Sequence, residues 1–254
     1  MAPGVSNAIN TVERLEQRVA CNRAAPGSFR RFVDRLLQVR ADDTVLDLGA
    51  GLGEQLIPAA ETAARAVGLD VSEEIVQALR QRLPGAGAEV VLGDMDDLAG
   101  LGLRGPFSLA YSVYSIYYSR DPARLVRGVA GRLSGRRARF VVVAPDLGNN
   151  EAWYADLGQL FPLPAPVLET VGVCRGVVLP AFLDVFPSVR CATFQSDVRF
   201  ATLDELMRYY DACAPYCRPE RRDEARAFFE RKFAESGSYR ISKRALGLVG
   251  RLHR

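Results

Sequence analysis

A short apolar strand that runs directly into a glycine-rich loop constrains this chain more than any other feature. Strand and loop read Val-Leu-Asp-Leu-Gly-Ala-Gly-Leu-Gly over residues 45–53, and residues 54–65 continue as a helix-compatible segment. A strand–loop–helix unit of this kind presents backbone N–H groups and a helix N-terminus to a ligand. Because glycine lacks a Cβ, the ligand can approach the main chain closely. The unit therefore predicts a site for a nucleotide-like cofactor.

The spacing of the glycines bears on which cofactor binds. A dinucleotide fingerprint has the form G-x-G-x-x-G, with an acid about 20 residues further on. Here Gly49, Gly51 and Gly53 follow one another at every second position, so the third glycine comes one position early. Asp47 also precedes the first glycine by two residues. Glycine-rich turns after strands are common, so the loop alone leaves the choice of cofactor open.

The pattern of an acid after an apolar strand occurs twice more. Asp70 ends a predicted strand over residues 67–70, and Asp94 comes near the end of a predicted strand over residues 89–95. A single Asp in this place has an ordinary structural explanation, because its side chain caps turns. Three acids in register after three successive strands favour a shared site instead.

Residues 42–145 resemble the cofactor-binding region of the class I S-adenosylmethionine-dependent methyltransferases, small-molecule type. The resemblance implies that Asp47 and the glycine loop hold the amino-acid end of S-adenosylmethionine, and that Asp70 accepts hydrogen bonds from both ribose hydroxyls. It places Asp94 near the adenine amino group, with Val71 and Met95 packing nearby. On this basis the expected cofactor-binding residues are Asp47, Gly49, Ala50, Gly51, Gly53, Asp70, Val71, Asp94, Met95 and Tyr111.

Predicted strands and helices alternate as far as Pro145, which demands right-handed crossovers and a parallel sheet. Residues 139–144 are almost purely apolar, as expected for a central strand buried on both faces. A late strand–helix–strand block over residues 189–248 is similar to the antiparallel hairpin that ends the sheet of this family. We expect an α/β fold: a Rossmann-like, seven-stranded, mostly parallel sheet with helices on both faces, an N-terminal helical cap and a lid insertion after strand five.

Two segments outside the alternating core complete the predicted domain organisation. Residues 8–24 and 28–40 show helical spacing of apolar residues, and they predict a helical cap over residues 1–41 ahead of a methyltransferase domain over residues 42–254. Residues 146–187 lack strand alternation and are too long for an ordinary connection. We expect them to form a lid over the substrate; the alternative is an insertion that only buttresses the sheet.

Three helix starts carry recognisable capping sequences. Ser72 is followed by two glutamates, and Asp121 is followed by a proline. Thr202 and Glu205 have the spacing of a capping box. Each predicts the first turn of a helix.

Methyl transfer to a hydroxyl usually uses a general base, and histidine is the commonest choice. The only histidine is His253, second from the end of the sequence, where a catalytic role is disfavoured. That leaves N-, O- or C-methylation without a histidine base. The carboxylates to inspect first are Asp146, Glu151 and Glu169, although none stands out from the sequence.

Four tyrosines fall within residues 111–118, just beyond the fourth predicted strand. In the family this stretch faces the transferred methyl group, so Tyr114 and Tyr117 are candidates to surround a cationic or planar acceptor. Packing of an aromatic-rich helix start explains the same pattern equally well. The (Asn/Asp)-Pro-Pro-(Tyr/Phe) motif of enzymes that methylate the amino groups of nucleic-acid bases or glutamine does not occur here.

Composition narrows the functional classes. The chain has 33 basic and 30 acidic residues, a balance that does not favour a nucleic-acid groove. Five scattered cysteines indicate reduced thiols in the cytoplasm, and Cys213 and Cys217 lack further ligands, so we expect no metal site. The first residues show no basic region followed by an apolar stretch, so we expect no secretory signal. The apolar run over residues 172–186 is interrupted by charged and proline residues, so we expect no membrane span.

These observations favour an enzyme that transfers a methyl group from S-adenosylmethionine to a small molecule, plausibly in a bacterial biosynthetic pathway. Two alternatives stay open. One is a protein that binds S-adenosylmethionine without transferring methyl. The other is RNA methylation, for which basic clusters could contact phosphates: Arg132, Arg136, Arg137, Arg139, Arg218, Arg221 and Arg222.

Overall fold

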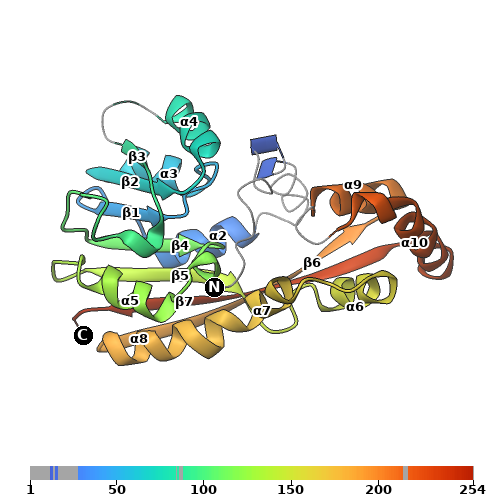
Figure 1. Cartoon of the computed structure of the whole chain (residues 1–254). Helices are drawn as coiled ribbons and strands as arrows, with labels where there is room; N and C mark the ends of the chain where they lie inside the picture. Colours follow the sequence, from blue (N-terminus) through green and yellow to red (C-terminus); the bar gives the residue numbers. More distant parts are fainter. Residues whose placement is uncertain are drawn as a thin grey trace.

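The computed structural model describes residues 12–13, 15–16, 28–83, 85, 88–213 and 217–253, and its core is a seven-stranded sheet (Figure 1). The strand order is β3-β2-β1-β4-β5-β7-β6. The strands are β1 (Thr44–Leu48), β2 (Arg65–Asp70), β3 (Ala88–Leu92), β4 (Leu109–Val113), β5 (Arg139–Pro145), β6 (Ser188–Phe200) and β7 (Tyr239–Arg251).

Six strands of this sheet, β1 to β6, run in one direction, and β7 runs in the opposite direction. β1 pairs with β2 and β4, β2 with β3, and β4 with β5, all in parallel, whereas β7 runs antiparallel to both β5 and β6. The predicted Rossmann-like fold, with a terminal antiparallel hairpin, is therefore confirmed. Because the carboxyl ends of parallel strands share one edge, the loops after β1, β2, β3 and β4 meet there.

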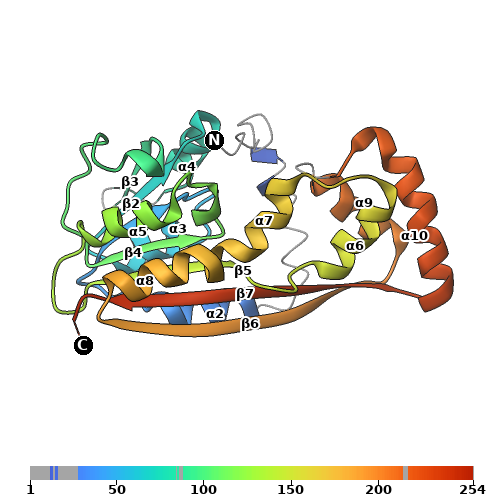
Figure 2. The same cartoon turned by 60° about the horizontal axis from the view of Figure 1, so that its bottom comes forward.

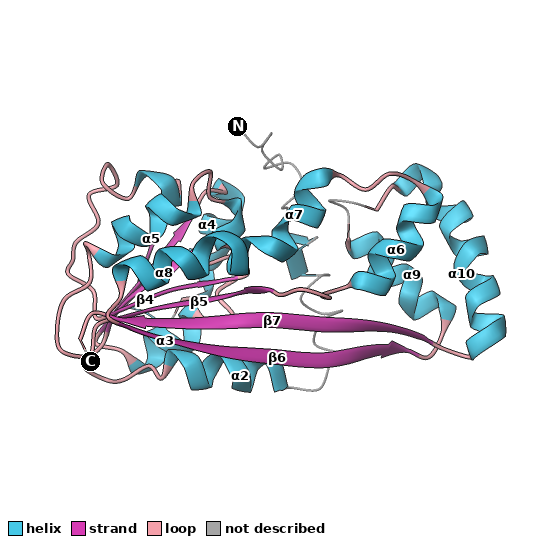
Figure 3. Cartoon of the chain, turned by 90° about the horizontal axis from the view of Figure 1, so that it is seen from below, coloured by secondary structure: helices cyan, strands magenta, loops and turns pink. Residues whose placement is uncertain are grey.

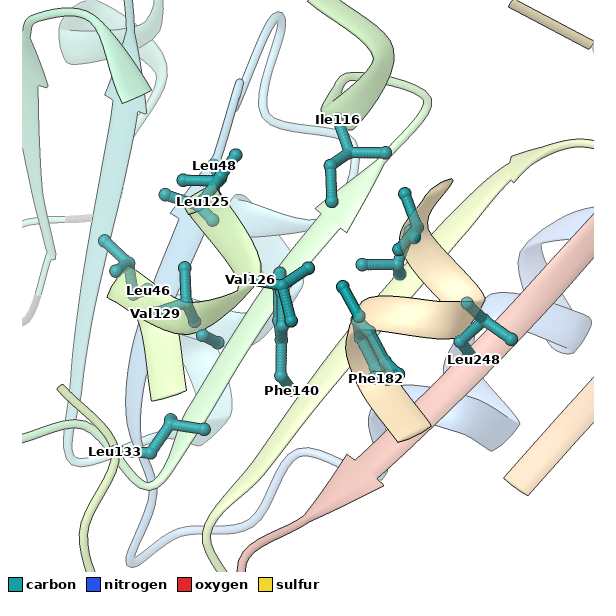
Figure 4. Packing of buried hydrophobic residues seen from close by; sticks show 14 of the residues in the cluster. Leu46, Leu48, Ile116, Leu125, Val126, Val129, Leu133, Phe140, Phe182 and Leu248 are labelled. Atoms are coloured by element: carbon teal, nitrogen blue, oxygen red, sulfur yellow. The ribbon is translucent and has the colours of Figure 1, made fainter. Parts of the chain in front are cut away.

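Helices cover both faces of the sheet, as predicted (Figure 3). They are α2 (Ser28–Leu37), α3 (Leu56–Thr62), α4 (Glu73–Arg82), α5 (Pro122–Ala130), α6 (Glu151–Leu160), α7 (Ala165–Val173), α8 (Leu179–Val185), α9 (Leu203–Ala212) and α10 (Arg222–Ser236). One hydrophobic cluster joins α2, α3 and α4 to the sheet, and another joins α5 and α8 to the opposite face. Figure 4 shows Val126 of α5 and Phe182 of α8 packed over Phe140 of β5.

The three predicted helix starts are confirmed. Ser72 caps α4 by accepting a hydrogen bond from the Ile75 N–H, and Asp121 caps α5, with proline in its first turn. The helix after the glycine loop is shorter than the expected 54–65. It ends at Thr62, because the chain must turn into β2 at Arg65.

Replacing Thr202 with alanine is expected to destabilise the fold by about 1 kcal/mol. In α9 the Thr202 hydroxyl accepts a hydrogen bond from the Glu205 N–H, and the Glu205 carboxylate accepts from the Thr202 N–H. The substitution leaves one N–H of the first turn without its capping acceptor. Urea unfolding measures the effect; Thr193→Ala, an exposed threonine on β6, should stay close to the wild type.

β6 and β7 are each 13 residues long and reach well beyond the rest of the sheet (Figures 1 and 2). At their far end α6, α9 and α10 pack around the strands in a third hydrophobic cluster, which we term the distal module. Trp153 of α6 is fully buried within it, stacked on the ring of Phe229 at 5.2 Å. The segment 146–187 is therefore divided: α6 belongs to the distal module, and α8 packs on the sheet. Its closure over a substrate stays a prediction.

Residues 165–185 form one helix, in which a π-helical segment (Cys174–Val178) joins α7 to α8. By length and composition alone this helix could cross a membrane, contrary to the expectation from sequence, because Arg175 and Pro180 do not interrupt it. In the structure one side of it, including Cys174 and Phe182, is buried against the sheet, and Arg175 is paired with Asp146.

The predicted N-terminal cap is described only in part. α2 packs against β5, β6 and β7, and most of the predicted helix 8–24 lies outside the described residues. Of that helix, Leu15 lies close to the glycine loop, 3.6 Å from where a Cβ on Gly51 would stand, and Glu16 pairs with Arg82 of α4. A cap that closes over the cofactor stays a prediction.

Candidate functional site

The glycine loop after β1 adopts a conformation that favours glycine. Gly49 and Gly53 have φ angles of +77° and +82°, in the left-handed region. A Cβ on Gly49 would also lie 2.5 Å from the Cβ of Ser115, and one on Gly53 would lie 2.5 Å from Leu79. Main-chain geometry thus favours glycine at both positions, and the Ser115 Cβ leaves no room for a side chain at Gly49.

Hydrogen bonds hold the loop against the end of β2. The N–H groups of Gly49 and Ala50 donate to the Leu69 carbonyl at 2.8 and 2.9 Å. The Gly51 N–H donates to Oδ2 of Asp70 at 2.9 Å, and the Ser72 N–H donates to Oδ1 at 3.0 Å. Asp70 therefore caps its own turn and also ties the two loops together. Each of its oxygens keeps a second lone pair for a further donor.

Asp47 and Tyr111 form a buried polar pair beneath this loop. They are register partners on the neighbouring strands β1 and β4, and both are almost fully buried. Neither Asp47 Oδ2 nor the Tyr111 hydroxyl finds a partner of good hydrogen-bond geometry among the described residues. Burial raises the pKa of Asp47 well above its usual value, and the charge of nearby Asp70 adds to the rise, although the neighbouring Tyr111 hydroxyl acts to lower it. Burial and the Asp47 carboxylate likewise raise the pKa of Tyr111.

Asp94 begins a short 3-10 helix after β3 and is held from two sides. Its Oδ1 accepts from the Asp96 N–H at 2.9 Å, and its Oδ2 pairs with the Arg120 guanidinium at 3.0 Å. Arg120 also pairs with Asp96, which accepts from the Ser119 hydroxyl as well. These contacts tie the loop after β3 to the loop after β4.

Two apolar residues stand beside these acids. The Val71 side chain, directly after Asp70, is 53% exposed, which is unusual for a valine next to a core strand. Met95, directly after Asp94, is half-buried, and its Cε lies 3.5 Å from where a Cβ on Gly49 would stand. The structure thus brings all ten predicted cofactor residues to one edge of the sheet.

Ser115 is a functional candidate that the sequence did not reveal. Its hydroxyl donates to the Leu48 carbonyl at 2.5 Å and shares a 2.6 Å hydrogen bond with the Ser112 hydroxyl. It thereby fixes the residue that leads into the glycine loop. Arg120 was missed for the same reason: the contacts of both residues join segments more than 20 residues apart, which no local pattern reveals.

The two candidate tyrosines differ in their surroundings. Tyr114 has a φ of +57°, and its ring meets that of Phe29 edge-on at 5.4 Å. Burial, with a smaller effect from Tyr154, raises its pKa, so at neutral pH it is a hydroxyl donor and not a phenolate base. Tyr117 packs against the core cluster under α5 and beside Tyr118, which agrees with the alternative that this aromatic stretch serves packing.

The three carboxylates considered as bases are poorly placed for that role. Asp146 forms a bidentate pair with Arg175, with distances of 2.5 and 2.7 Å. Although burial acts to raise its pKa, the Arg175 hydrogen bonds and charge outweigh this, so the pKa of Asp146 is lowered. Glu151 and Glu169 are exposed on α6 and α7, and among the described residues neither side chain contacts the glycine loop by a hydrogen bond or ion pair.

Across residues 28–213 and 217–253, with the gaps stated above, no three His, Cys, Asp or Glu side chains gather as a metal site. The four described cysteines are free thiols, and His253 is exposed just beyond β7.

Comparison with known proteins agrees with this geometry. Residues 45–134 match the family model described as a methyltransferase domain, a range that contains the glycine loop and all three acids. A curated relative, ribosomal RNA small subunit methyltransferase A of Streptomyces griseus, is 29% identical over 169 residues, which cover 56% of this chain. The match spans 57% of the length of that relative.

Solved structures share the fold at low sequence identity. The YcgJ protein of Bacillus subtilis has a TM-score of 0.59 and 14% identity, covering 88% of this chain and 97% of its own. A protein described as a putative methyltransferase of Bacillus halodurans has a TM-score of 0.59 and 13% identity, covering 90% and 100%. The [4+2]-cyclase SpnF has a TM-score of 0.53 and 15% identity, covering 89% and 82%.

Proposed function

We propose that this chain, which belongs to the class I S-adenosylmethionine-dependent methyltransferases through the domain of residues 45–134, methylates a small molecule. S-adenosylmethionine supplies an electrophilic methyl group on a sulfonium, and the protein supplies orientation and a site shielded from water. We place the reaction in the cytoplasm, which the free thiols of the described cysteines support.

The observation that carries the cofactor assignment is the pair of acids beside the glycine loop. Asp47 is buried, its Oδ2 lacks a partner among the described residues, and its pKa is raised by burial and by Asp70. A buried carboxylate of this kind gains most from a cationic ligand, because a positive charge offsets the cost of desolvation. We propose that it receives the ammonium of the cofactor, that Asp70 receives the ribose hydroxyls, and that Asp94, Val71 and Met95 surround the adenine.

Five of the seven arginines considered for RNA are engaged in other contacts, which supports a small acceptor, whereas Arg136 and Arg137 are exposed. Arg139 is buried in an ion pair with Asp43, and Arg132 donates to the Leu98 and Leu103 carbonyls. The arginines near residue 220 also have partners. Arg218 lies over the Phe161 ring, Arg221 pairs with Glu224, and Arg222 pairs with Asp211. Arginines held in such contacts are less available to contact phosphates.

The second candidate function is RNA methylation, which the curated relative favours, since its name specifies ribosomal RNA. Binding of small-subunit RNA that falls steeply with salt, together with label transfer from S-adenosylmethionine, would support it. A protein that binds the cofactor without transferring methyl is the remaining alternative. Tight cofactor binding with no labelled product from a metabolite extract would favour that outcome.

Calorimetry with S-adenosylhomocysteine tests the cofactor site. We expect binding in the micromolar range that is lost in Asp47→Ala and weakened in Asp70→Ala, because each removes a proposed acceptor. Since the pKa of Asp47 is raised, the wild-type affinity should also fall as the pH is lowered and this carboxylate takes up a proton.

The control for these variants is Asp97→Ala, which removes an acid from the 3-10 helix that follows Asp94. It should bind S-adenosylhomocysteine as the wild type does. Binding of NAD by the wild type, with no response to S-adenosylhomocysteine, would contradict the assignment.

A further inference from the structure

The face of the sheet that carries α2 also carries a basic residue among aromatic rings. Phe194 and Ser196 of β6 are register partners of Ala245 and Lys243 of β7. Phe194 and Ala245 belong to the cluster under α2, so Lys243, two residues along the strand, has its side chain on the same face. α9 covers the next part of this face, where Val198 and Ile241 are buried.

The aromatic side of this region comes from three separate elements. Phe29 of α2 meets Tyr114 at the end of β4 at 5.4 Å and Phe194 of β6 at 5.2 Å, both edge-on. All three rings are only half-buried. Tyr114 follows the last residue of β4 and directly precedes Ser115, whose hydroxyl donates to the Leu48 carbonyl at the entry to the glycine loop. Half-buried rings next to a proposed methyl-donor site suit a planar acceptor.

The polar side of the region is centred on Lys243. Its ammonium donates to the Tyr209 hydroxyl at 2.6 Å and lies 4.7 Å from the centre of that ring. Tyr209 is nearly fully buried, whereas Lys243 is half-buried. A lysine ammonium beside a tyrosine hydroxyl recognises a carboxylate by its charge and by hydrogen bonding.

Two polar atoms nearby point to a polar ligand. The Trp153 indole N–H is fully buried, its ring lies 5.5 Å from that of Tyr209, and it has no hydrogen-bond partner among the described residues. Oδ1 of Asn150 is also buried without a hydrogen-bond partner among the described residues, while the amide nitrogen of Asn150 donates to the Tyr154 hydroxyl. Buried polar groups without a partner are rare in native proteins.

We propose that Lys243, with Tyr209, binds the carboxylate of an aromatic methyl acceptor whose ring lies among Phe29, Tyr114 and Phe194. This inference rests on the proposed function and narrows its substrate class to aromatic acids. The residues are contributed by α2, β4, β6, β7 and α9, so the site exists only in the folded chain. Lys243 acts in binding, not in the transfer step.

The test compares two probes that differ only in charge, 4-hydroxybenzoate and 4-hydroxybenzamide, on the full chain with S-adenosylhomocysteine present. Trp153 is the only tryptophan, so its fluorescence reports binding near Tyr209, and calorimetry gives a second readout. We expect the benzoate to bind the wild type about tenfold more tightly than the benzamide. Lys243→Met should abolish that preference, and Lys243→Arg should keep most of it.

Arg240→Met is the matched control, since Arg240 is an exposed basic residue on the same strand. It should keep the wild-type preference. Absence of benzoate binding, equal binding of the two probes by the wild type, or a preference that survives in Lys243→Met would overturn the proposal. A wild type that does not bind S-adenosylhomocysteine would instead contradict the proposed function, so the two failures can be told apart. Thermal unfolding checks that each variant is folded.

Discussion

Replacing Asp43 with alanine is expected to destabilise the fold by about 3 to 5 kcal/mol, because it leaves the other partner of a buried ion pair without its counter-charge. Asp43 precedes β1, and its Oδ2 lies 2.8 Å from Nη2 of Arg139 at the start of β5. The two side chains are 4% and 5% exposed, respectively. Asp43 also accepts hydrogen bonds from the Ser108 hydroxyl and the Arg40 N–H. Its removal leaves the guanidinium buried without its counter-charge.

Urea unfolding at neutral pH measures this loss. The matched control is Asp42→Ala, which removes an exposed acid one residue earlier and should change stability by less than about 0.5 kcal/mol. Equal stability of the two variants would show that the pair contributes little.

The pair also predicts a dependence on pH. Burial acts to raise the pKa of Asp43, but hydrogen bonds from Arg139 and Ser108 and the charge of Arg139 outweigh it, so the pKa is lowered from 3.8. A lowered pKa in the folded state means that this contribution is fully present above pH 4 or so and is lost as the pH falls through the folded value. The gap in stability between wild type and Asp43→Ala should therefore shrink in acid.

Replacing Gly49 with alanine is expected to weaken S-adenosylhomocysteine binding by about 100-fold. The φ of +77° costs an alanine about 1 to 2 kcal/mol. The new Cβ would also lie 2.5 Å from that of Ser115, whose hydroxyl fixes the Leu48 carbonyl, so relieving the contact must shift the loop. Together these costs correspond to about two orders of magnitude in affinity.

Gly102→Ala controls for the backbone strain alone. Gly102 has a φ of +60°, and a Cβ there would meet no atom within 4 Å. It should therefore lose some stability yet bind S-adenosylhomocysteine as the wild type does. If Gly49→Ala binds normally in calorimetry, the loop is more adaptable than its packing indicates.

Much of the fold follows from local patterns. The capping residues Ser72, Asp121 and Thr202 begin their helices as predicted, because a cap acts within one turn. The strands were recognised by apolar runs, and the parallel order followed from their alternation with helices. The predicted end of the helix after the glycine loop was wrong, because the neighbouring strand β2 sets where that helix ends.

Long-range contacts account for what the sequence could not reveal. The sequence pattern predicts the two strands β6 and β7 in part. No local pattern indicates that α6, α9 and α10 pack together at the far end of these strands. Asp146, a candidate base from the sequence, is paired with Arg175, which lies 29 residues away. Among the arginines considered for RNA, Arg139 and Arg132 are likewise engaged with Asp43 and the Leu98 carbonyl, 96 and 34 residues away.

The sequence by itself determined that the three acids and the glycines meet at one edge of the sheet, because each follows a strand and parallel strands end together. The tertiary structure decided the rest: that Asp47 faces Tyr111, that Ser115 packs against Gly49, and that Lys243 reaches Tyr209. The physical reason is that hydrogen bonds and charge pairs act over a few ångströms in space. Only the folded chain brings residues from distant segments within that range.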